Sequence, residues 1–425
     1  MTVRPFDRVL AASPFRVGTP DMDDAGPELR PTHEDAATAF ARLATQVPAY
    51  DLPAIVDLAG AAMGASTARL LVPDYAMLSL HEPGREHPTG SRIPIEGTLA
   101  GRTYIKGDAV STGSGPITVW LPIGLDSERL GVLELELAGW GGAPTPAMDD
   151  LVRALALALV SKRRYSDVLA RSRRSEPLSV AAEIQWDLLP PLSCVTDHVS
   201  IAGMLEPAYS IGGDSFDYAL NPDRAEFAII DAVGHGMPAV LKSVVAVHAL
   251  RNARREGRSI EEAYLATGEV LQAEYRDWSF VTGQIGDLDL ETGMLTWLNA
   301  GHPLPLLVRS GRLAGELACP PSLPMGLGGG VRALATEHLQ AGDRVLFYTD
   351  GVIETRSPSG EPFGVERLAD YLVRATLDHV HPTETARRLS ASVVRYNGVG
   401  LSDDATLLLV EYRGGPSTGD EPIAG

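Results

Sequence analysis

The stretch FAIIDAVGHG, residues 227–236, decides the fold of the larger part of this chain. Its apolar run predicts a buried strand that ends at Asp231. The glycines after the aspartate allow positive φ angles and a close approach of the backbone to a ligand, so the carbonyl of Ala232 could also face a cation. The stretch therefore predicts a strand that delivers oxygen ligands to a site at its end.

Three further motifs place aspartates beside apolar runs or turns: GGDSFD at 212–217, TDG at 349–351 and SDDAT at 402–406. Carboxylates that converge raise one another's pKa unless cations lie between them, and oxygen-only ligands favour Mg²⁺ or Mn²⁺. Two such ions, about 3.5–4 Å apart, would suit the hydrolysis of a phosphate ester. The candidate ligands are Asp214, Asp231, Asp350, Asp403 and Asp404.

The composition limits the class of protein. The chain has 425 residues, enough for two or three domains, and a formal net charge of −19. Nucleic acid and anionic membranes bind basic surfaces, so neither is an expected partner, and we expect a soluble cytoplasmic protein. The two cysteines, Cys194 and Cys319, form no CxxC motif and are expected to be buried free thiols.

The first part of the chain divides into a polar terminus and an α+β domain. Residues 1–30 are rich in Pro, Asp and Gly and are expected to be disordered. Residues 31–145 form the first domain, with predicted helices at 34–46 and 52–63 and predicted strands at 68–72, 76–80, 117–123 and 130–138. A hairpin connection is expected at 124–129.

Residues 146–192 are predicted to be a helical linker, with helices at 151–168 and 178–189. The second helix should stop at Pro190-Pro191, because proline lacks the backbone donor and disfavours helix in the residue before it. An apolar stripe on such a linker favours dimerisation or signalling, and simple packing on the neighbouring domain is an equal alternative.

The third block, 193–413, alternates hairpin strands with pairs of helices. Strands are predicted at 199–205, 226–230, 280–290, 294–299, 304–309, 344–348 and 405–412, and helices at 237–255, 260–275, 365–375 and 383–396. The spacing of Ser259 and Glu262 predicts a capping box. This order favours an α+β sandwich of sheets covered by antiparallel helices, followed by a disordered tail at 414–425.

Two histidines lie among glycines, His235 and His302. A histidine metal site usually needs a second His or a Cys at close spacing, and neither residue has one. We therefore expect His235 and His302 to have structural roles or to support the metal ligands from behind.

The third block resembles the SpoIIE-type, RsbU-like branch of the metal-dependent serine/threonine phosphatases, the PPM or protein phosphatase 2C superfamily. The resemblance covers residues 181–412 and rests on motifs in the family order: EIQ at 183–185, LLPP at 188–191, GGDSFD, DAVGHG at 231–236, NAGHP at 299–303, TDGVIE at 349–354, FG at 363–364 and SDDAT. It implies an α-β-β-α sandwich that binds two Mn²⁺ or Mg²⁺ ions and hydrolyses phosphoserine or phosphothreonine with metal-activated water.

The resemblance also implies a role for each motif. Asp231 would bridge the two metals, Asp214 and the Ala232 carbonyl would complete one, and Asp350 and Asp403 would hold the other. Asp404 would orient or support these ligands. The phosphate-binding arginine of the eukaryotic branch has no evident counterpart here.

The first domain resembles a GAF domain in GASTARL at 64–70, IEGTLAG at 95–101, LPI at 121–123 and LGVLEL at 130–135. GAF domains sense small molecules or dimerise, and the ligand here is not readable. The domain contains no cysteine, which argues against a covalently bound bilin. The combination implies a homodimer, formed through the GAF-like domain and the linker, that dephosphorylates a STAS-type anti-sigma factor antagonist. In this hypothesis the GAF-like domain alters the packing of residues 151–189.

Three alternatives stay open. GGDSF resembles the GGDEF signature of nucleotide cyclases, but has Ser for Glu and leaves the later acidic motifs without a role. A histidine kinase would need an ATP lid and a phosphoacceptor helix, which we do not find. A catalytically silent, GAF-containing scaffold that binds a signalling partner is the main rival.

Overall fold

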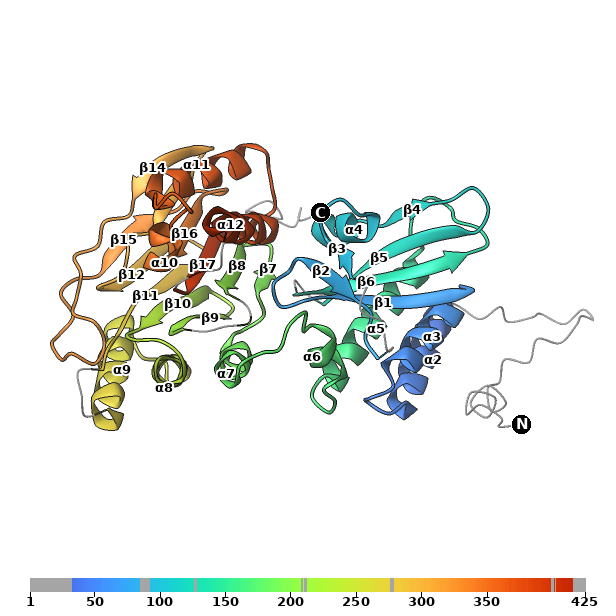
Figure 1. Ribbon diagram of the computed structural model, residues 1–425, viewed down its shortest axis with the longest axis horizontal. Coiled ribbons are helices and arrows are strands. Elements are labelled where there is room, and N and C mark those ends of the chain that lie inside the picture. Colours follow the sequence, from blue (N-terminus) through green and yellow to red (C-terminus); the bar gives the residue numbers. More distant parts are fainter. Residues whose placement is uncertain are drawn as a thin grey trace, which may run out of the picture.

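The computed structural model describes residues 33–84, 92–125, 128–207, 209, 212–275, 279–398, 401 and 403–415. The N-terminal sheet with its helices lies beside two C-terminal sheets, and α6 (Val168–Ser172) and α7 (Val180–Leu188) lie along the connection between them (Figure 1). The predicted disorder concerns residues 1–30, which lie outside the described residues, and the tail 414–425, of which only 414 and 415 are described. Within those ranges, no helix is both long and apolar enough to cross a lipid bilayer.

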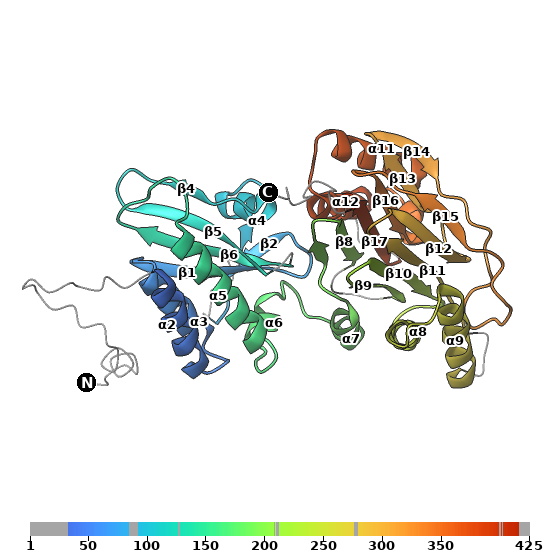
Figure 2. The ribbon, with the colours of Figure 1, turned by 180° about the vertical axis from the view of Figure 1, so that it is seen from behind.

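The N-terminal domain contains a six-stranded sheet in the order β3-β2-β1-β6-β5-β4. Helices α2 (His33–Gln46), α3 (Leu52–Ala62) and α5 (Pro146–Lys162) cover one face, and Figure 2 shows them from behind. The short helix α4 (Leu99–Lys106), which the sequence pattern does not predict, contacts β4, β5 and β6. The strands are β1 Thr67–Pro73, β2 Ser79–His81, β3 Ile93–Pro94, β4 Val110–Thr112, β5 Ile117–Leu125 and β6 Glu128–Leu137.

Besides α4, β3 and β4, which the sequence pattern does not predict, two details of the first domain differ from the prediction. The strand predicted at 76–80 is wrong in its first half, because Asp74 Oδ1 accepts hydrogen bonds from the backbone N–H groups of Leu78 (2.8 Å) and Ser79 (3.2 Å). These bonds hold a turn, with Met77 at φ 56°, and the strand begins only at Ser79. The hairpin strands β5 and β6 extend to Leu125 and Glu128, so its remaining turn residues, 126–127, lie outside the described residues.

Helix α5 ends earlier than predicted. The sequence pattern predicts helix through residue 168, but α5 stops at Lys162, and a turn precedes the short helix α6 (Val168–Ser172). Lys162 Nζ donates to the carbonyl of Val47 at 2.6 Å, which fixes this end to the first domain. Residues 163–167, between α5 and α6, have no apolar face that a longer helix would bury, and Tyr165 among them is 80% exposed.

The C-terminal domain is a four-layer sandwich. A five-stranded sheet, β15-β12-β11-β10-β9, packs on a six-stranded sheet, β14-β13-β16-β17-β8-β7. Helices α8 (Met237–Arg255) and α9 (Ile260–Glu274) cover the first sheet, and α11 (Gly364–Leu377) and α12 (Pro382–Asn397) cover the second (Figure 1). The predicted layered α+β sandwich is therefore confirmed for this domain, as is the capping box between Ser259 and Glu262.

The strands of the sandwich alternate between two cores. Phe227 and Ile229 of β10 pack between the sheets, whereas Ala228 and Ile230 pack under α8 and α9. The strands of this domain are β7 Ser193–Val195, β8 Val199–Glu206, β9 Asp214–Leu220, β10 Arg224–Ala232, β11 Val281–Asp289, β12 Met294–Ala300, β13 Leu306–Arg309, β14 Arg312–Glu316, β15 Ala335–His338, β16 Arg344–Tyr348 and β17 Ala405–Tyr412. The sequence pattern does not predict β7, β9, β14, β15 or the short helix α10 (Asp350–Glu354).

Candidate metal centre

Asp214 and Asp231 lie directly opposite each other on the antiparallel strands β9 and β10. Residues opposite each other in such a pair point to the same face of the sheet. The alternation along β10 places Asp231 on the side of the second sheet, together with Phe227 and Ile229. Both carboxylates therefore belong to the edge of the space between the two sheets.

The second sheet brings the other motifs to the same end. Strands β16 and β17 are antiparallel neighbours, so the end of β16 meets the start of β17. Asp350 begins α10 just after β16, and Asp403 and Asp404 come just before β17. The backbone N–H of Asp214 donates to Asp404 Oδ2 at 3.2 Å, which joins the two sheets directly.

Two glycines allow the chain to close around Asp404. A Cβ atom on Gly351 would stand 1.7 Å from the Asp404 carbonyl oxygen, and one on Gly212 would stand 2.3 Å from Asp404 Oδ2. The backbone excludes a side chain at Gly351, and at Gly212 the Asp404 carboxylate would have to shift, so close approach favours glycine at both positions.

Burial and like charge raise the pKa of the clustered carboxyl groups. For Asp214, burial raises the pKa most, and the charges of Asp231 and Asp404 add to it. Burial also raises the pKa of Asp231, with Asp350 and Asp403 as the neighbouring charges. The pKa values of Asp404 and Asp350 are raised as well, again chiefly by burial.

The residues fit a divalent cation by their chemistry. Five carboxylates lie at one end of the sandwich, and within the described ranges none of them forms an ion pair with Lys, Arg or His. In the described part of the chain, however, no three Asp, Glu, His or Cys side chains are close enough together to enclose a metal ion. The candidate ligands therefore lie at the same end of the sandwich, but their side chains are not close enough together to surround a metal ion.

Neither histidine belongs to this cluster of ligands. His302 is 6% exposed, and burial lowers its pKa to about 3. Its ring Nδ1 lies 3.1 Å from Thr282 Oγ1, and its backbone N–H donates to Asn299 Oδ1 at 2.7 Å, which fits a structural role in the NAGHP turn. His235 is exposed on the loop after β10.

The expectation for the cysteines holds in part. Cys319 is a buried free thiol, whereas Cys194 is only partly buried.

Sequence reasoning missed two residues that hold the site together. The Thr349 hydroxyl donates to Asp214 Oδ2 at 2.6 Å and accepts from the backbone N–H of Thr406 at 2.9 Å. On α7 (Val180–Leu188), the buried Gln185 amide donates to the carbonyl of Asp214. Both residues occur in motifs noted from the sequence, but only the tertiary contacts assign them a partner.

Comparisons with known proteins find similarity in the same part of the chain. Residues 221–413 match the family model of stage II sporulation protein E (SpoIIE); the match begins after Asp214 and includes the other acidic motifs and NAGHP. Protein IcfG of Synechocystis is 24% identical over 266 residues, which cover 56% of this chain and 41% of IcfG. The phosphoserine phosphatase RsbU of Bacillus subtilis is 21% identical over 240 residues, which cover 56% of this chain and 70% of RsbU.

A solved structure of the RsbU and RsbW domains of a Mycobacterium tuberculosis protein is 28% identical, with a TM-score of 0.46. The alignment covers 52% of this chain and 62% of the mycobacterial chain. This chain thus spans less than two thirds of both IcfG and the mycobacterial protein.

Together, the sandwich, the acidic end and the family match define the class of the C-terminal domain, which is that of the PP2C-type serine/threonine phosphatases. Within that class, the domain belongs to the SpoIIE family, to which residues 221–413 match directly.

Proposed function

We propose that the protein is a metal-dependent phosphatase that removes phosphate from phosphoserine or phosphothreonine on a regulatory protein. The observation that carries this proposal is the convergence of Asp214, Asp231 and Asp404 with Asp350 and Asp403, without cationic side-chain partners among the described residues. A pair of Mn²⁺ or Mg²⁺ ions, when bound, supplies Lewis-acid activation of water and of the phosphoryl group.

Both sheets of the sandwich would supply metal ligands. Asp214, Asp231 and the Ala232 carbonyl would supply ligands from the β9–β10 edge, and Asp350 and Asp403 from the second sheet. Two hydrogen bonds would orient Asp214: the one that its carboxylate accepts from Thr349, and the one that its backbone N–H donates to Asp404. Asp214, Asp404 and Thr349 are buried, which keeps bulk water from competing for the oxygens of these two carboxylates.

The proposed substrate is a phosphorylated STAS-type anti-sigma factor antagonist. Support comes from the match to the SpoIIE family and from the similarity to RsbU, a protein named as a phosphoserine phosphatase. We place both this substrate and the enzyme in the cytoplasm as part of the same proposal.

We further propose that the N-terminal domain is a GAF-like sensor that regulates the phosphatase through the 151–189 segment. The Tyr75 and Trp186 rings lie 4.7 Å apart, and the Arg173 guanidinium stacks 4.4 Å from the centre of the Tyr75 ring. Trp186 neighbours Gln185, whose amide holds the Asp214 carbonyl. A shift of the first domain would therefore reach the metal ligands through α7.

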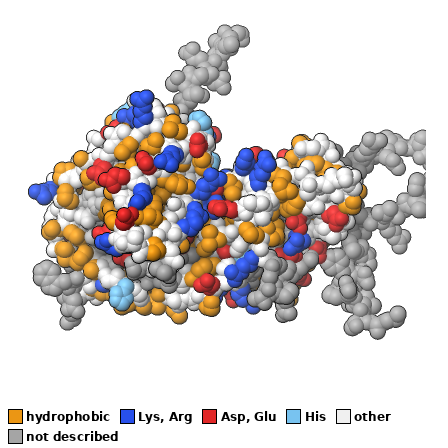
Figure 3. Space-filling view, turned by 45° about the horizontal axis from the view of Figure 1, so that its top comes forward, with side chains coloured by type: hydrophobic (Ala, Val, Ile, Leu, Met, Phe, Trp, Pro, Cys, Tyr) orange, Lys and Arg blue, Asp and Glu red, His pale blue; other side chains and the backbone are white. Residues whose placement is uncertain are grey.

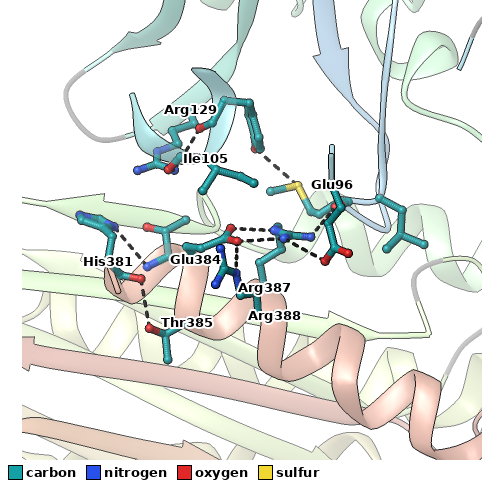
Figure 4. A network of polar contacts seen from close by, with 12 residues as sticks. Glu96, Ile105, Arg129, His381, Glu384, Thr385, Arg387 and Arg388 are labelled. Carbon is teal, nitrogen blue, oxygen red and sulfur yellow. Dashed lines mark hydrogen bonds and ion pairs between the residues drawn. The ribbon is translucent and has the colours of Figure 1, made fainter. Parts of the chain in front are cut away.

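A second contact joins the first domain to α12, where Arg387 is 3% exposed (Figure 4). Arg387 pairs with Glu384 of its own helix at 2.7 Å, lies 3.5 Å from Glu96 of the first domain and donates to the Met77 carbonyl at 3.3 Å. Because α12 leads into the loop that carries Asp403 and Asp404, this contact offers a second route from the sensor to the site.

The homodimer is likewise part of the proposal. Helix α5 is capped and packed in the first domain, yet Leu157 is 56% exposed on it, and Tyr165 is 80% exposed just beyond its end. A second copy would cover these side chains. Sedimentation of the full chain, compared with a Leu157→Glu variant, tests this part on its own.

The phosphatase itself is tested by hydrolysis of p-nitrophenyl phosphate with added Mn²⁺. Wild-type protein should turn over only with the cation, and Asp231→Asn should lose at least a hundredfold in rate, because it removes one of the proposed metal ligands. Asp223→Asn is the matched control, since Asp223 pairs with Arg224 at the surface and lies outside the site. A wild-type protein that binds Mn²⁺ but hydrolyses neither this ester nor phosphoserine peptides would favour the silent scaffold.

A further inference from the structure

A basic pocket lies beside β9, on the face of the sheet opposite the metal ligands. It has a volume of about 400 Å³, and its lining residues are Pro190, Asp217, Tyr218, Ala219, Asn221, Arg251, Arg254 and Arg255. Asp217 follows Asp214 by three positions on the strand, so the two side chains point to opposite faces, about 10 Å apart along β9. The pocket is thus close to the candidate metal centre but separate from it.

Two of the arginines are held in place by one buried carboxylate. Asp217 is 1% exposed; its Oδ1 accepts from Arg251 Nε (2.9 Å) and a terminal nitrogen (2.7 Å), and its Oδ2 accepts from Arg254 (2.8 Å). Arg251 also donates to the Leu188 carbonyl at the end of α7, at 2.7 Å. Asp217 therefore orients both guanidinium groups but compensates only one of the two charges.

Arg255 adds a third positive charge, is exposed, and forms no ion pair with the residues that the structure describes. Glu226 lies next to the lining, since its Oε2 accepts from Asn221 Nδ2 at 2.9 Å; Arg254 acts to lower its pKa, although burial raises that pKa overall. Asp217 and Glu226 together compensate two of the three arginine charges, so the pocket keeps a positive charge. The chain as a whole has a net charge of −19, so this pocket attracts anions that most of the molecule repels.

Figure 3 illustrates the contrast with the general surface. On the face that it shows, acidic and basic side chains are interspersed, with hydrophobic side chains between them. The pocket, whose lining has three arginines of α8 and only one carboxylate, Asp217 of β9, is a local departure from that mixture.

We propose that this arginine pocket binds carboxylate side chains of an acidic segment in the phosphoprotein substrate, while the phosphorylated residue occupies the metal centre. The proposal rests on the proposed phosphatase function. Guanidinium groups that are already oriented bind carboxylates with little further loss of side-chain freedom. Arg255 makes the contact that is free to form, and Arg251 and Arg254 complete the positive field.

The test compares two phosphoserine peptides that differ only in an acidic run, Asp residues in one and Asn residues in the other. Wild-type protein should show a KM about fivefold lower for the acidic peptide, the effect that one partly exposed ion pair supplies. Arg255→Gln should remove that preference and leave kcat and the hydrolysis of p-nitrophenyl phosphate unchanged. Arg258→Gln is the control, since Arg258 pairs with Glu256 outside the pocket. Equal preference in wild type and Arg255→Gln overturns the proposal.

A binding measurement separates this proposal from the phosphatase proposal. Fluorescence anisotropy with the unphosphorylated acidic peptide and metal-free protein needs no catalysis, and Arg255→Gln should weaken that binding about fivefold. Such a result would support the pocket even if no ester were hydrolysed. Inorganic phosphate should displace the peptide no more effectively than chloride does at the same ionic strength. Displacement by phosphate alone at low millimolar concentration would assign the pocket to free phosphate and overturn the carboxylate assignment.

Discussion

Thr349 and Asp214 are 135 positions apart in the sequence, and the threonine hydroxyl donates to the aspartate carboxylate at 2.6 Å. The bond joins β9 of one sheet to the end of β16 in the other. Both side chains are buried, so neither group can exchange this partner for water. The position of Asp214 therefore depends on a residue that is itself no metal ligand.

Thr349→Val should lower the free energy of unfolding by about 1–3 kcal/mol, because it leaves a buried carboxylate oxygen without its donor. It should also reduce the rise in melting temperature that Mn²⁺ produces. Thr267→Val is the control: its hydroxyl is equally buried but bonds only to Ala263 within α9. Equal Mn²⁺ responses in both variants would separate Thr349 from the metal site.

Gly351→Ala should disturb the site without removing any ligand. The new methyl group would stand 1.7 Å from the Asp404 carbonyl oxygen, so the loop that carries Asp403 and Asp404 must move. We expect at least a hundredfold loss of Mn²⁺-dependent activity together with weaker Mn²⁺ binding by calorimetry. Gly330→Ala meets no atom within 4 Å and should behave as wild type. Normal Mn²⁺ affinity in Gly351→Ala would show that the loop tolerates the shift.

The sequence predicted most of the sandwich because its strands and helices bury apolar runs of regular period, such as β10 and α8. Strand β9 escaped prediction, since Asp214, Ser215 and Asp217 give it a polar pattern that only the neighbouring elements explain. The acidic motifs were found as separate turns or strand ends. Their convergence follows from the register of β9 with β10 and of β16 with β17, which no local pattern contains.

The same limit applies to residues outside the site. Asp217 faces the arginines of α8, whereas Asp214 faces the second sheet. The hydrophobic pattern of the sequence does not distinguish these two aspartates. The end of α5 was also not predicted, because helix propensity continues beyond Lys162. In the structure the helix ends there, where Lys162 contacts Val47 and the following residues lack an apolar face.

The buried His302 predicts a specific dependence of stability on acid. Burial lowers the pKa of its ring to about 3 in the folded state, against an ordinary value near 6.5. The unfolded chain therefore takes up the proton first, and stability is lost as the pH falls from about 6.5 towards 3. His302→Gln should make the fall between pH 6 and pH 4 shallower, by up to about 1.4 kcal/mol per pH unit. Urea denaturation at several pH values measures this, and the exposed His338→Gln should keep the wild-type slope.

Glu96→Lys should loosen the contact between the first domain and α12. Glu96 is 62% exposed on its side chain, so the loss of its pairing with the buried Arg387 should cost roughly 1 kcal/mol or less. Hydrogen exchange in α12 should become faster at the Arg387 turn, and phosphatase activity should change if α12 transmits a signal. Asp108→Lys, an equal charge change at an exposed position of the same domain, is the control. Unchanged exchange in Glu96→Lys would remove α12 from the route.

Each sheet of the sandwich carries only part of the carboxylate set, with Asp214 and Asp231 on one and Asp350, Asp403 and Asp404 beside the other. A fragment that keeps a single sheet, or an intermediate in which the sheets have separated, thus lacks a complete set of donors. Mn²⁺ affinity would then report on folding. It should be lost in one cooperative step when the two sheets separate, before helical content is lost.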